Sequence, residues 1–260
     1  MSFRIVIPAR FASTRLPGKP LRDICGKPMI AHVIERANQS KADEVIVATD
    51  SKDIADAISG LDVRVCMTHE NHQSGTERLS EVIEQLGFDD EQILINLQGD
   101  EPMMPPVCLN QVAQALEEDS NVKMATLCTP LTDIEELFDP HAVKVVRDIN
   151  NFALYFTRAA VPWSKEWSKE CPPDSQNGTP RKLPAQQEYQ RHIGLYGYRA
   201  GFIRQYLAWE SSDIEKTESL EQLRVLYYGE KIKVITAEIP PGPGVDTLDD
   251  LNRVCESLSK

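Results

Sequence analysis

Residues 3–20 read FRIVIPARFASTRLPGKP, a short apolar run followed by a loop rich in prolines and cations. The run at 3–7 is almost continuously apolar and ends at a proline, which is typical of a strand buried on both faces of a parallel sheet. The loop carries Arg10, Arg15 and Lys19. The stretch therefore predicts a buried strand that leads directly into a basic loop.

The segments that follow alternate between helix and strand patterns. Helix patterns fall at residues 29–37, 54–58 and 76–86. Strand patterns fall between and after them, at 44–48, 63–66 and 92–97. This alternation predicts βαβ units and an α/β fold with a mostly parallel central sheet flanked by helices. Ligands of such sheets bind at the carboxyl ends of strands. The loops after Ile7 and Leu97 are therefore the expected site.

The second half of the chain is less regular. Strand patterns fall at 123–128, 143–147, 152–157, 193–199 and 231–237, and helix patterns at 220–228 and 247–258. Residues 164–190 contain four prolines and few apolar side chains, so we expect an exposed excursion with little core of its own.

The composition excludes several classes of protein. The chain has 260 residues, 28 Lys+Arg against 40 Asp+Glu and a net charge of −12, which disfavours general binding to nucleic acid or to an anionic membrane. We expect no signal peptide and no membrane-spanning segment. The six cysteines are widely spaced and form no CxxC pair, so we expect buried thiols in a reducing cytoplasm.

The basic loop stands out against this acidic background. Arginine forks and a lysine point charge suit a triphosphate, and Ser13 and nearby backbone N–H groups add donors. The loop contains neither a Walker A nor a GxGxxG pattern, which argues against an ATPase and a dinucleotide oxidoreductase. A solvated basic loop that forms surface ion pairs is the alternative.

Two acids follow predicted strands. Asp100 comes after the run at 92–97 and beside Gly99, where it can hold Mg²⁺ against substrate phosphates. Asp246 precedes the closing helix, so N-capping is its alternative role. Mg²⁺ takes only one or two protein carboxylates, and this pair is enough if the fold brings it together.

The strand pattern near residue 195 is unusually polar. In strict alternation His192, Gly194, Tyr196 and Tyr198 share one face. With Arg158, this face would suit a pocket for an acidic sugar, although a structural histidine is the alternative. Glu221 and Gln222 lie on a predicted helix, and the default expectation is that both side chains face solvent.

Eight motifs together resemble the family of 3-deoxy-manno-octulosonate (Kdo) cytidylyltransferases. In chain order they are IPARFASTRLPGKPL at 7–21, VATD at 47–50, SGTER at 74–78, INLQGDEP at 95–102, YFTRAAVPW at 155–163, RHIGLYGYR at 191–199, LEQLR at 220–224 and GVDT at 244–247. The resemblance implies a nucleotidyltransferase fold, a homodimer and transfer of CMP from CTP to Kdo with Mg²⁺, for lipopolysaccharide biosynthesis. The excursion at 164–190 is longer and richer in proline than this family leads us to expect.

The resemblance also implies roles for individual residues. Those for the nucleotide are Arg10, Ser13, Arg15, Lys19, Ser74, Gly75 and Arg78. Those for the sugar are Gln98, Arg158, His192, Tyr196, Glu221 and Gln222. Asp100 and Asp246 ligate Mg²⁺ and, with Arg15 and Lys19, form the catalytic set. The implied domain is single, 1–260, with a nucleotide-binding core at 1–130, a smaller β-rich portion for sugar binding and dimerisation at 131–240, and a closing segment at 241–260.

Other functions stay open at this point. The acceptor could be 8-amino-Kdo or sialic acid, although the strand at 191–199 favours Kdo. A metal-dependent glycosyltransferase would use Asp100 and Glu101 as a DxD-like site and would release no pyrophosphate from CTP. A non-catalytic regulator would bind CTP without turnover.

Overall fold

The computed structural model describes residues 2–12, 16–72, 74–167, 182–184 and 188–258. The chain divides into two compact units. Unit 1 comprises Met1–Ala125, Leu195–Ala208 and Glu238–Lys260, and unit 2 comprises Thr126–Gly194 and Trp209–Ala237.

Unit 1 is built on a parallel sheet. Its strands are β1 (Phe3–Ala9), β4 (Glu44–Thr49), β5 (Arg64–Met67) and β6 (Ile93–Asn96), in the order β6-β1-β4-β5 with every neighbouring pair parallel. The last residues of β10 (Tyr189–Arg199) add an antiparallel strand beside β6. The predicted α/β fold with a mostly parallel central sheet is confirmed.

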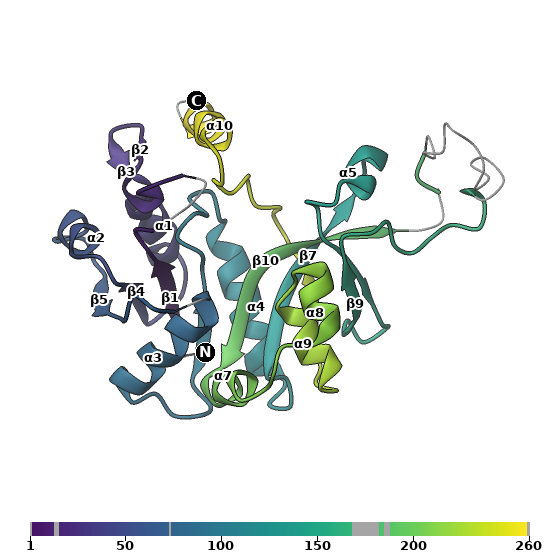
Figure 1. Cartoon of the computed structure of the whole chain (residues 1–260), viewed down its shortest axis with the longest axis horizontal. Helices are drawn as coiled ribbons and strands as arrows, with labels where there is room; N and C mark the ends of the chain where they lie inside the picture. Colours follow the sequence, from purple (N-terminus) through teal and green to yellow (C-terminus); the bar gives the residue numbers. More distant parts are fainter. Residues whose placement is uncertain (1, 13–15, 73, 168–181, 185–187, 259–260) are drawn as a thin grey trace. The chain divides into compact units, whose positions relative to one another are not determined.

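The core of unit 1 follows from the apolar runs. Phe3, Ile5, Val6 and Ile7 of β1 are all 0% exposed, so this strand is covered on both faces as its pattern predicts. Figure 1 shows helices beside this sheet. They are α1 (Met29–Asn38), α2 (Lys52–Ala57), α3 (Gly75–Leu86) and α4 (Pro106–Glu118), and α7 (Ala200–Leu207) packs on α3. The last helix, α10 (Leu248–Leu258), packs on β2 (Asp23–Ile24) instead.

Local signals explain several boundaries in unit 1. Ser51 accepts a hydrogen bond from the Ile54 backbone N–H and caps α2, which explains where this helix begins. Ahead of α1, the basic loop continues into a 3-10 turn, η1 (Lys19–Leu21), and a hairpin of β2 (Asp23–Ile24) and β3 (Lys27–Pro28). The sequence analysis predicted neither the hairpin nor α4.

Unit 2 is richer in strand. It contains most of β7 (Met124–Leu131), β8 (Lys144–Arg147), β9 (Ala153–Thr157), the first part of β10 and β11 (Lys233–Thr236). β7 lies between β11 and β10, and β8 pairs with β10 and antiparallel with β9. Its helices are α5 (Ile134–Phe138), α8 (Asp213–Glu218) and α9 (Gln222–Tyr227), and α9 packs on α8 and β9 (Figure 1).

The predicted excursion at 164–190 differs from expectation in its described residues. Trp167 is only 2% exposed and stacks on Tyr189 at 5.7 Å between ring centroids. Both rings belong to an apolar cluster with Leu131 and Leu137. The segment therefore contributes large side chains to the core of unit 2, and residues 168–181 and 185–187 lie outside the described residues.

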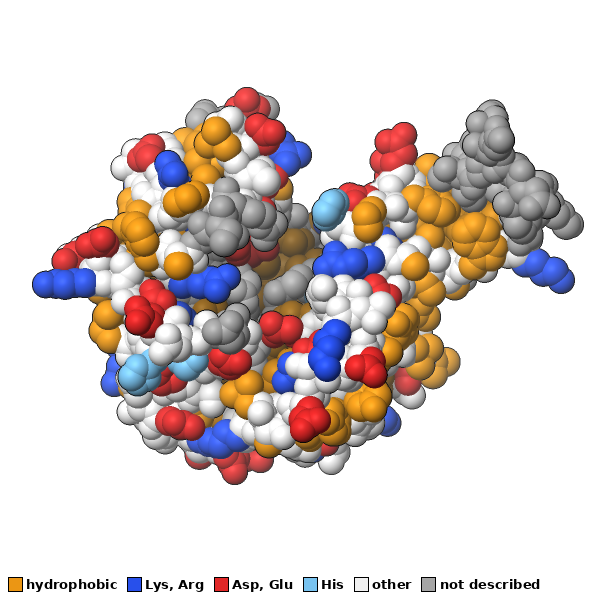
Figure 2. Space-filling model, viewed as in Figure 1, with side chains coloured by type: hydrophobic (Ala, Val, Ile, Leu, Met, Phe, Trp, Pro, Cys, Tyr) orange, Lys and Arg blue, Asp and Glu red, His pale blue; other side chains and the backbone are white. Residues whose placement is uncertain are grey.

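The surface carries both signs of charge. On the face shown in Figure 2, acidic and basic side chains are interspersed. Within the described residues, no helix is long and apolar enough to cross a membrane.

Candidate active site

The basic loop begins where β1 ends. Arg10 is exposed, and Ser13 and Arg15 lie outside the described residues. Gly18 adopts a left-handed conformation (φ 65°), which a side chain would strain, and it turns the chain into η1. Lys19, the first residue of η1, is 9% exposed.

Asp100 follows β6 at the same edge of the sheet. Gly99 allows its backbone to pass close to β1, because a Cβ on Gly99 would lie 3.0 Å from the Pro8 carbonyl oxygen. The Asp100 carbonyl accepts a hydrogen bond of 2.9 Å from the Val245 N–H. Residue 246 is thereby held beside the loop after β6.

Lys19, Asp100 and Asp246 meet at this edge. The Lys19 ammonium donates to Asp100 Oδ2 at 2.6 Å and to Asp246 Oδ1 at 2.9 Å. Burial lowers the pKa of Lys19, but the charges of both carboxylates and their hydrogen bonds outweigh it and hold the pKa above its usual value. The two acids, far apart in sequence, are therefore neighbours in the fold.

Asp246 does not cap the closing helix. The Thr247 hydroxyl accepts from the Asp250 N–H at 3.2 Å, and Asp250 Oδ2 accepts from the Thr247 N–H at 2.8 Å. This reciprocal pair caps α10. Although burial opposes the change, hydrogen bonds from Thr247, Asp246 and Arg253 lower the pKa of Asp250 to about 2. The N-capping alternative for Asp246 is wrong.

The start of α3 lies at the same edge. Ser74 caps the helix by accepting from the Glu77 N–H, and a Cβ on Gly75 would lie 3.5 Å from Gln98 Nε2. Arg78 is 3% exposed and bonds to Asp50 Oδ2 at 2.7 Å and to Thr68 Oγ1. Its side chain therefore joins α3 to the ends of β4 and β5, and its nucleotide-binding role stays a prediction.

Arg158 of unit 2 is held by backbone carbonyls. Its Nε donates to the Glu218 carbonyl at 2.7 Å, its Nη1 to Pro140 at 2.9 Å and its Nη2 to Ser219 at 3.5 Å. The Glu218 carboxylate instead accepts from Thr157 Oγ1 at 2.6 Å and from the Arg158 backbone N–H at 3.0 Å.

His192 of unit 2 is a neutral ring. Its Nε2 lies 3.0 Å from Thr126 Oγ1, whose hydroxyl donates to the Ile193 carbonyl. The contacts are satisfied when Nε2 carries the ring proton. Burial lowers the pKa of His192 to about 3, and the ring packs edge-on against Phe156.

The remaining predicted sugar residues are divided between the units. Gln98 and Tyr196 belong to unit 1, where Tyr196 stacks with Tyr198 at 6.1 Å between ring centroids. In unit 2, Glu221 is exposed ahead of α9, whereas Gln222 is 6% exposed. The default of a solvated face therefore fails for Gln222.

Two residues in these contacts were not assigned to a site from sequence. Asp50 lies in the VATD motif, which could have marked it as the partner of a buried arginine. Glu218 gave no signal, because a single glutamate in a polar segment is typical of a solvated surface.

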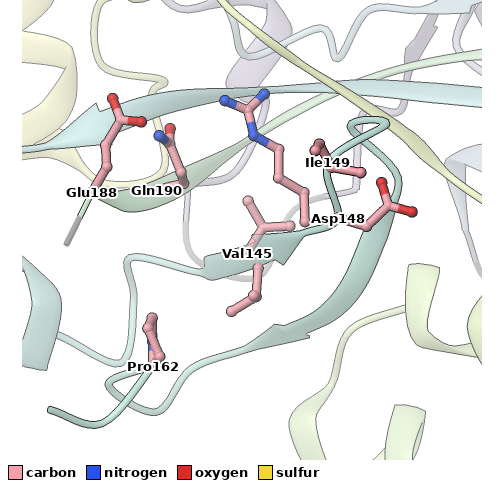
Figure 3. Close-up of a pocket in the computed structure, with 8 residues that line it drawn as sticks. Val145, Asp148, Ile149, Pro162, Glu188 and Gln190 are labelled. Atoms are coloured by element: carbon pink, nitrogen blue, oxygen red, sulfur yellow. The ribbon is translucent and has the colours of Figure 1, made fainter.

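A separate cavity opens in unit 2 beside β8. It measures about 320 Å³, and Val145, Asp148, Pro162 and Gln190 are among its lining residues (Figure 3). Gln190 is 6% exposed, and its Oε1 has no hydrogen-bond partner in the described part of the chain. None of the predicted site residues lines this cavity.

Comparison with solved structures first identifies the class of protein to which this fold belongs. A nucleotidyl transferase from Methanothermobacter thermautotroptrophicus shares the fold, with a TM-score of 0.60 and 16% identity over 99% of this chain and 97% of the other. A solved CMP:2-keto-3-deoxy-manno-octonic acid synthetase complexed with CTP matches with a TM-score of 0.87 and 39% identity, over 99% of this chain and 98% of the other. The fold is that of a nucleotidyltransferase.

The family follows from sequence. The cytidylyltransferase family model matches residues 4–232, and the chain belongs to that family. The chain is 53% identical over 259 residues to the 3-deoxy-manno-octulosonate cytidylyltransferase of Pasteurella multocida (strain Pm70). The alignment covers 100% of this chain and 99% of that protein. The resemblance found in the eight motifs is confirmed.

Proposed function

We propose that this chain transfers CMP from CTP to Kdo, giving CMP-Kdo and pyrophosphate, and so activates Kdo for lipopolysaccharide biosynthesis. The observation that carries the proposal is the convergence of Lys19, Asp100 and Asp246 at the carboxyl edge of a parallel sheet. The 53% identity to a Kdo cytidylyltransferase supports the choice of acceptor.

The two carboxylates suit Mg²⁺. Mg²⁺ is commonly bound by one or two protein carboxylates together with substrate phosphates and water, and the side chains of Asp100 and Asp246 are 35% and 49% exposed. No group of three or more His, Cys, Asp or Glu suited to a metal occurs in the described residues, so Asp100 and Asp246 would hold it as a pair. When bound, Mg²⁺ supplies Lewis-acid polarisation of the α-phosphate and lowers the pKa of the attacking hydroxyl.

The nucleotide is assigned to unit 1. Lys19 stays cationic at neutral pH because its pKa is raised, and it donates to the triphosphate. Ser74 and Gly75 lie at the N-terminus of α3, where backbone N–H groups favour anionic or polar ligand atoms. Arg10 and Arg15 supply further positive charge for the phosphates.

The acid group of the sugar is assigned to Arg158. Three of its five N–H donors are used by carbonyls, so two remain for a carboxylate. The neutral His192 ring and the Glu221 and Gln222 side chains suit sugar hydroxyls, and Gln98 and Tyr196 complete the set.

The reaction is an in-line phosphoryl transfer. The anomeric hydroxyl oxygen of Kdo forms a bond to the α-phosphorus of CTP and releases its proton to water, while the bond from the α-phosphorus to the bridging oxygen breaks and pyrophosphate leaves with the electron pair. Such a transfer depends on positioning and charge stabilisation more than on covalent catalysis. Lys19 and Arg15 offset the charge that develops on pyrophosphate.

A homodimer in the cytoplasm completes the proposal. Unit 2 exposes large apolar side chains, among them Ile149 (96%), Leu154 (60%), Trp163 (53%) and Tyr227 (62%), which a second copy would cover. The described cysteines are all free thiols, which suits a reducing compartment. Analytical ultracentrifugation tests the dimer, and a monomer at micromolar concentration would contradict it.

The decisive experiment measures pyrophosphate release from CTP, with and without Kdo, in Mg²⁺ and in EDTA. We expect release only when both sugar and metal are present. Parallel reactions with 8-amino-Kdo and sialic acid test the acceptor, and a higher kcat/KM for either would replace Kdo in the proposal. CTP binding without release on any acceptor would indicate a regulator.

A further inference from the structure

Among the residues that the structure describes, Lys144 is a buried cation with no acid in ion-pair contact. Its side chain is 0% exposed, and its ammonium donates to the carbonyl of Asp139 at 2.7 Å. Burial lowers the pKa of Lys144 below its usual value, although nearby Asp139, Glu136 and Glu218 act against the shift. An ammonium buried on a neutral oxygen is costly, because the desolvated charge is only partly compensated.

The guanidinium of Arg158 is held by the same turn. Its Nη1 donates to the carbonyl of Pro140, the residue after Asp139, so the two cations bind consecutive carbonyls. The register supports this proximity, because Lys144 on β8 pairs with Thr157 on β9, next to Arg158. Within the described residues, neither cation has a carboxylate within ion-pair distance.

A neighbouring arginine shows the usual arrangement. Arg191 pairs with Lys144 across the β8–β10 ladder, and its guanidinium forms an ion pair with Glu136 at 2.8 Å. Acids are therefore present in this part of unit 2. However, Glu136 neutralises Arg191, and the carboxylate of Glu218 accepts hydrogen bonds from neutral donors. The positive charge of Lys144 and Arg158 is left for a ligand from outside.

We propose that Lys144 is a positioning residue for the carboxylate of the sugar: it holds the Asp139–Pro140 turn that orients Arg158, and it adds buried positive charge beside the guanidinium. This inference rests on the proposed function, because it takes the acceptor to be a sugar acid. Its effect falls on the binding of the acid and not on CTP, whose residues belong to unit 1.

The test replaces Lys144 by a side chain of similar length without charge. Lys144→Met is expected to raise the KM for Kdo by about tenfold, with kcat and the KM for CTP within about twofold of wild type. The matched control is Lys233→Met, because Lys233 also donates to a backbone carbonyl at 2.7 Å in unit 2 but is not buried. The control is expected to leave both KM values unchanged.

Two further measurements separate a charge effect from a purely structural one. Lys144→Gln keeps a hydrogen-bond donor but removes the charge, and it is expected to raise the KM for Kdo as Lys144→Met does, whereas Lys144→Arg returns it towards the wild-type value. Inhibition by the neutral C1 amide of Kdo is expected to be unchanged in the methionine variant. If Lys144→Met does not fold, the comparison of Lys144→Gln with Lys144→Arg provides the test.

The outcomes distinguish the two proposals. Wild-type protein that uses Kdo, together with folded neutral variants of unchanged KM for Kdo, overturns the role of Lys144 alone. Equal losses for Kdo and for its amide assign Lys144 a structural role and also overturn the inference. Wild-type protein that releases no pyrophosphate with Kdo overturns the proposed function and this inference with it.

Discussion

Two buried lysines show how differently the two units treat charge. Lys19 in unit 1 bridges the carboxylates of Asp100 and Asp246, and its pKa is raised. Lys144 in unit 2 donates to a neutral carbonyl, and its pKa is lowered. The cluster in unit 1 has more acid than base and suits an added cation, whereas the pair in unit 2 suits an anion. The charges of the groups around a lysine therefore indicate the charge of the ligand better than the charge of the lysine does.

The largest expected effect comes from removing an acid in unit 1. Asp100→Asn is expected to lower kcat by about a thousandfold or more, because it removes half of the carboxylate charge assigned to the metal. The measurement is pyrophosphate release at saturating CTP, Kdo and Mg²⁺, with circular dichroism to check the fold. Asp249→Asn, an exposed acid in the first turn of α10, is the matched control. Normal turnover in Asp100→Asn would show that the acid excess of unit 1 has another purpose.

A smaller effect is expected from removing a cation in unit 2. Arg158→Met is expected to raise the KM for Kdo by about 30- to 100-fold, which corresponds to about 2–3 kcal/mol for a lost hydrogen bond between charged groups. The KM for CTP should not change. Arg191→Met sharpens the comparison, because that guanidinium is already neutralised by Glu136. If both variants lose the same sugar affinity, the distinction between paired and unpaired cations fails.

The smallest expected effect concerns His192 and pH. Its folded pKa of about 3 lies below the ordinary value of 6.5, so protons bind the unfolded chain more readily. The stabilisation from the neutral ring is complete above pH 6.5 and is lost as the pH falls from 6.5 towards 3, by about 1 kcal/mol per pH unit. Urea unfolding of wild type and His192→Gln from pH 7 to pH 5 measures it. A wild-type slope equal to that of the variant would mean that His192 protonates freely.

Much of unit 1 could be predicted because three of its strands, β1, β4 and β6, are largely buried on both faces. The runs that became these strands are mostly apolar, whereas β5 is largely exposed. Helix α4 was missed because two prolines at 105–106 resemble a break. Pro106 instead occupies the first turn, where a missing N–H costs nothing.

The candidate site was predictable in its residue types but not in its contacts. The sequence named Asp100 and Asp246 as a metal pair that requires proximity, and the fold places both against Lys19, whereas their metal role stays a prediction. The contacts of Arg158 could not be predicted, since its partners are backbone carbonyls, which every residue supplies. The contact of Lys144 could not be predicted either, because its partner is also a backbone carbonyl.

The cap of α10 has a consequence for protein engineering. Thr247 and Asp250 satisfy the start of the helix between themselves, so its stability does not depend on the carboxylate of Asp246. Position 246 can therefore be exchanged for glutamate or histidine without a penalty at the helix start. If Asp246 holds a metal as proposed, the choice of metal can then be altered at this one position while the cap of the closing helix stays in place.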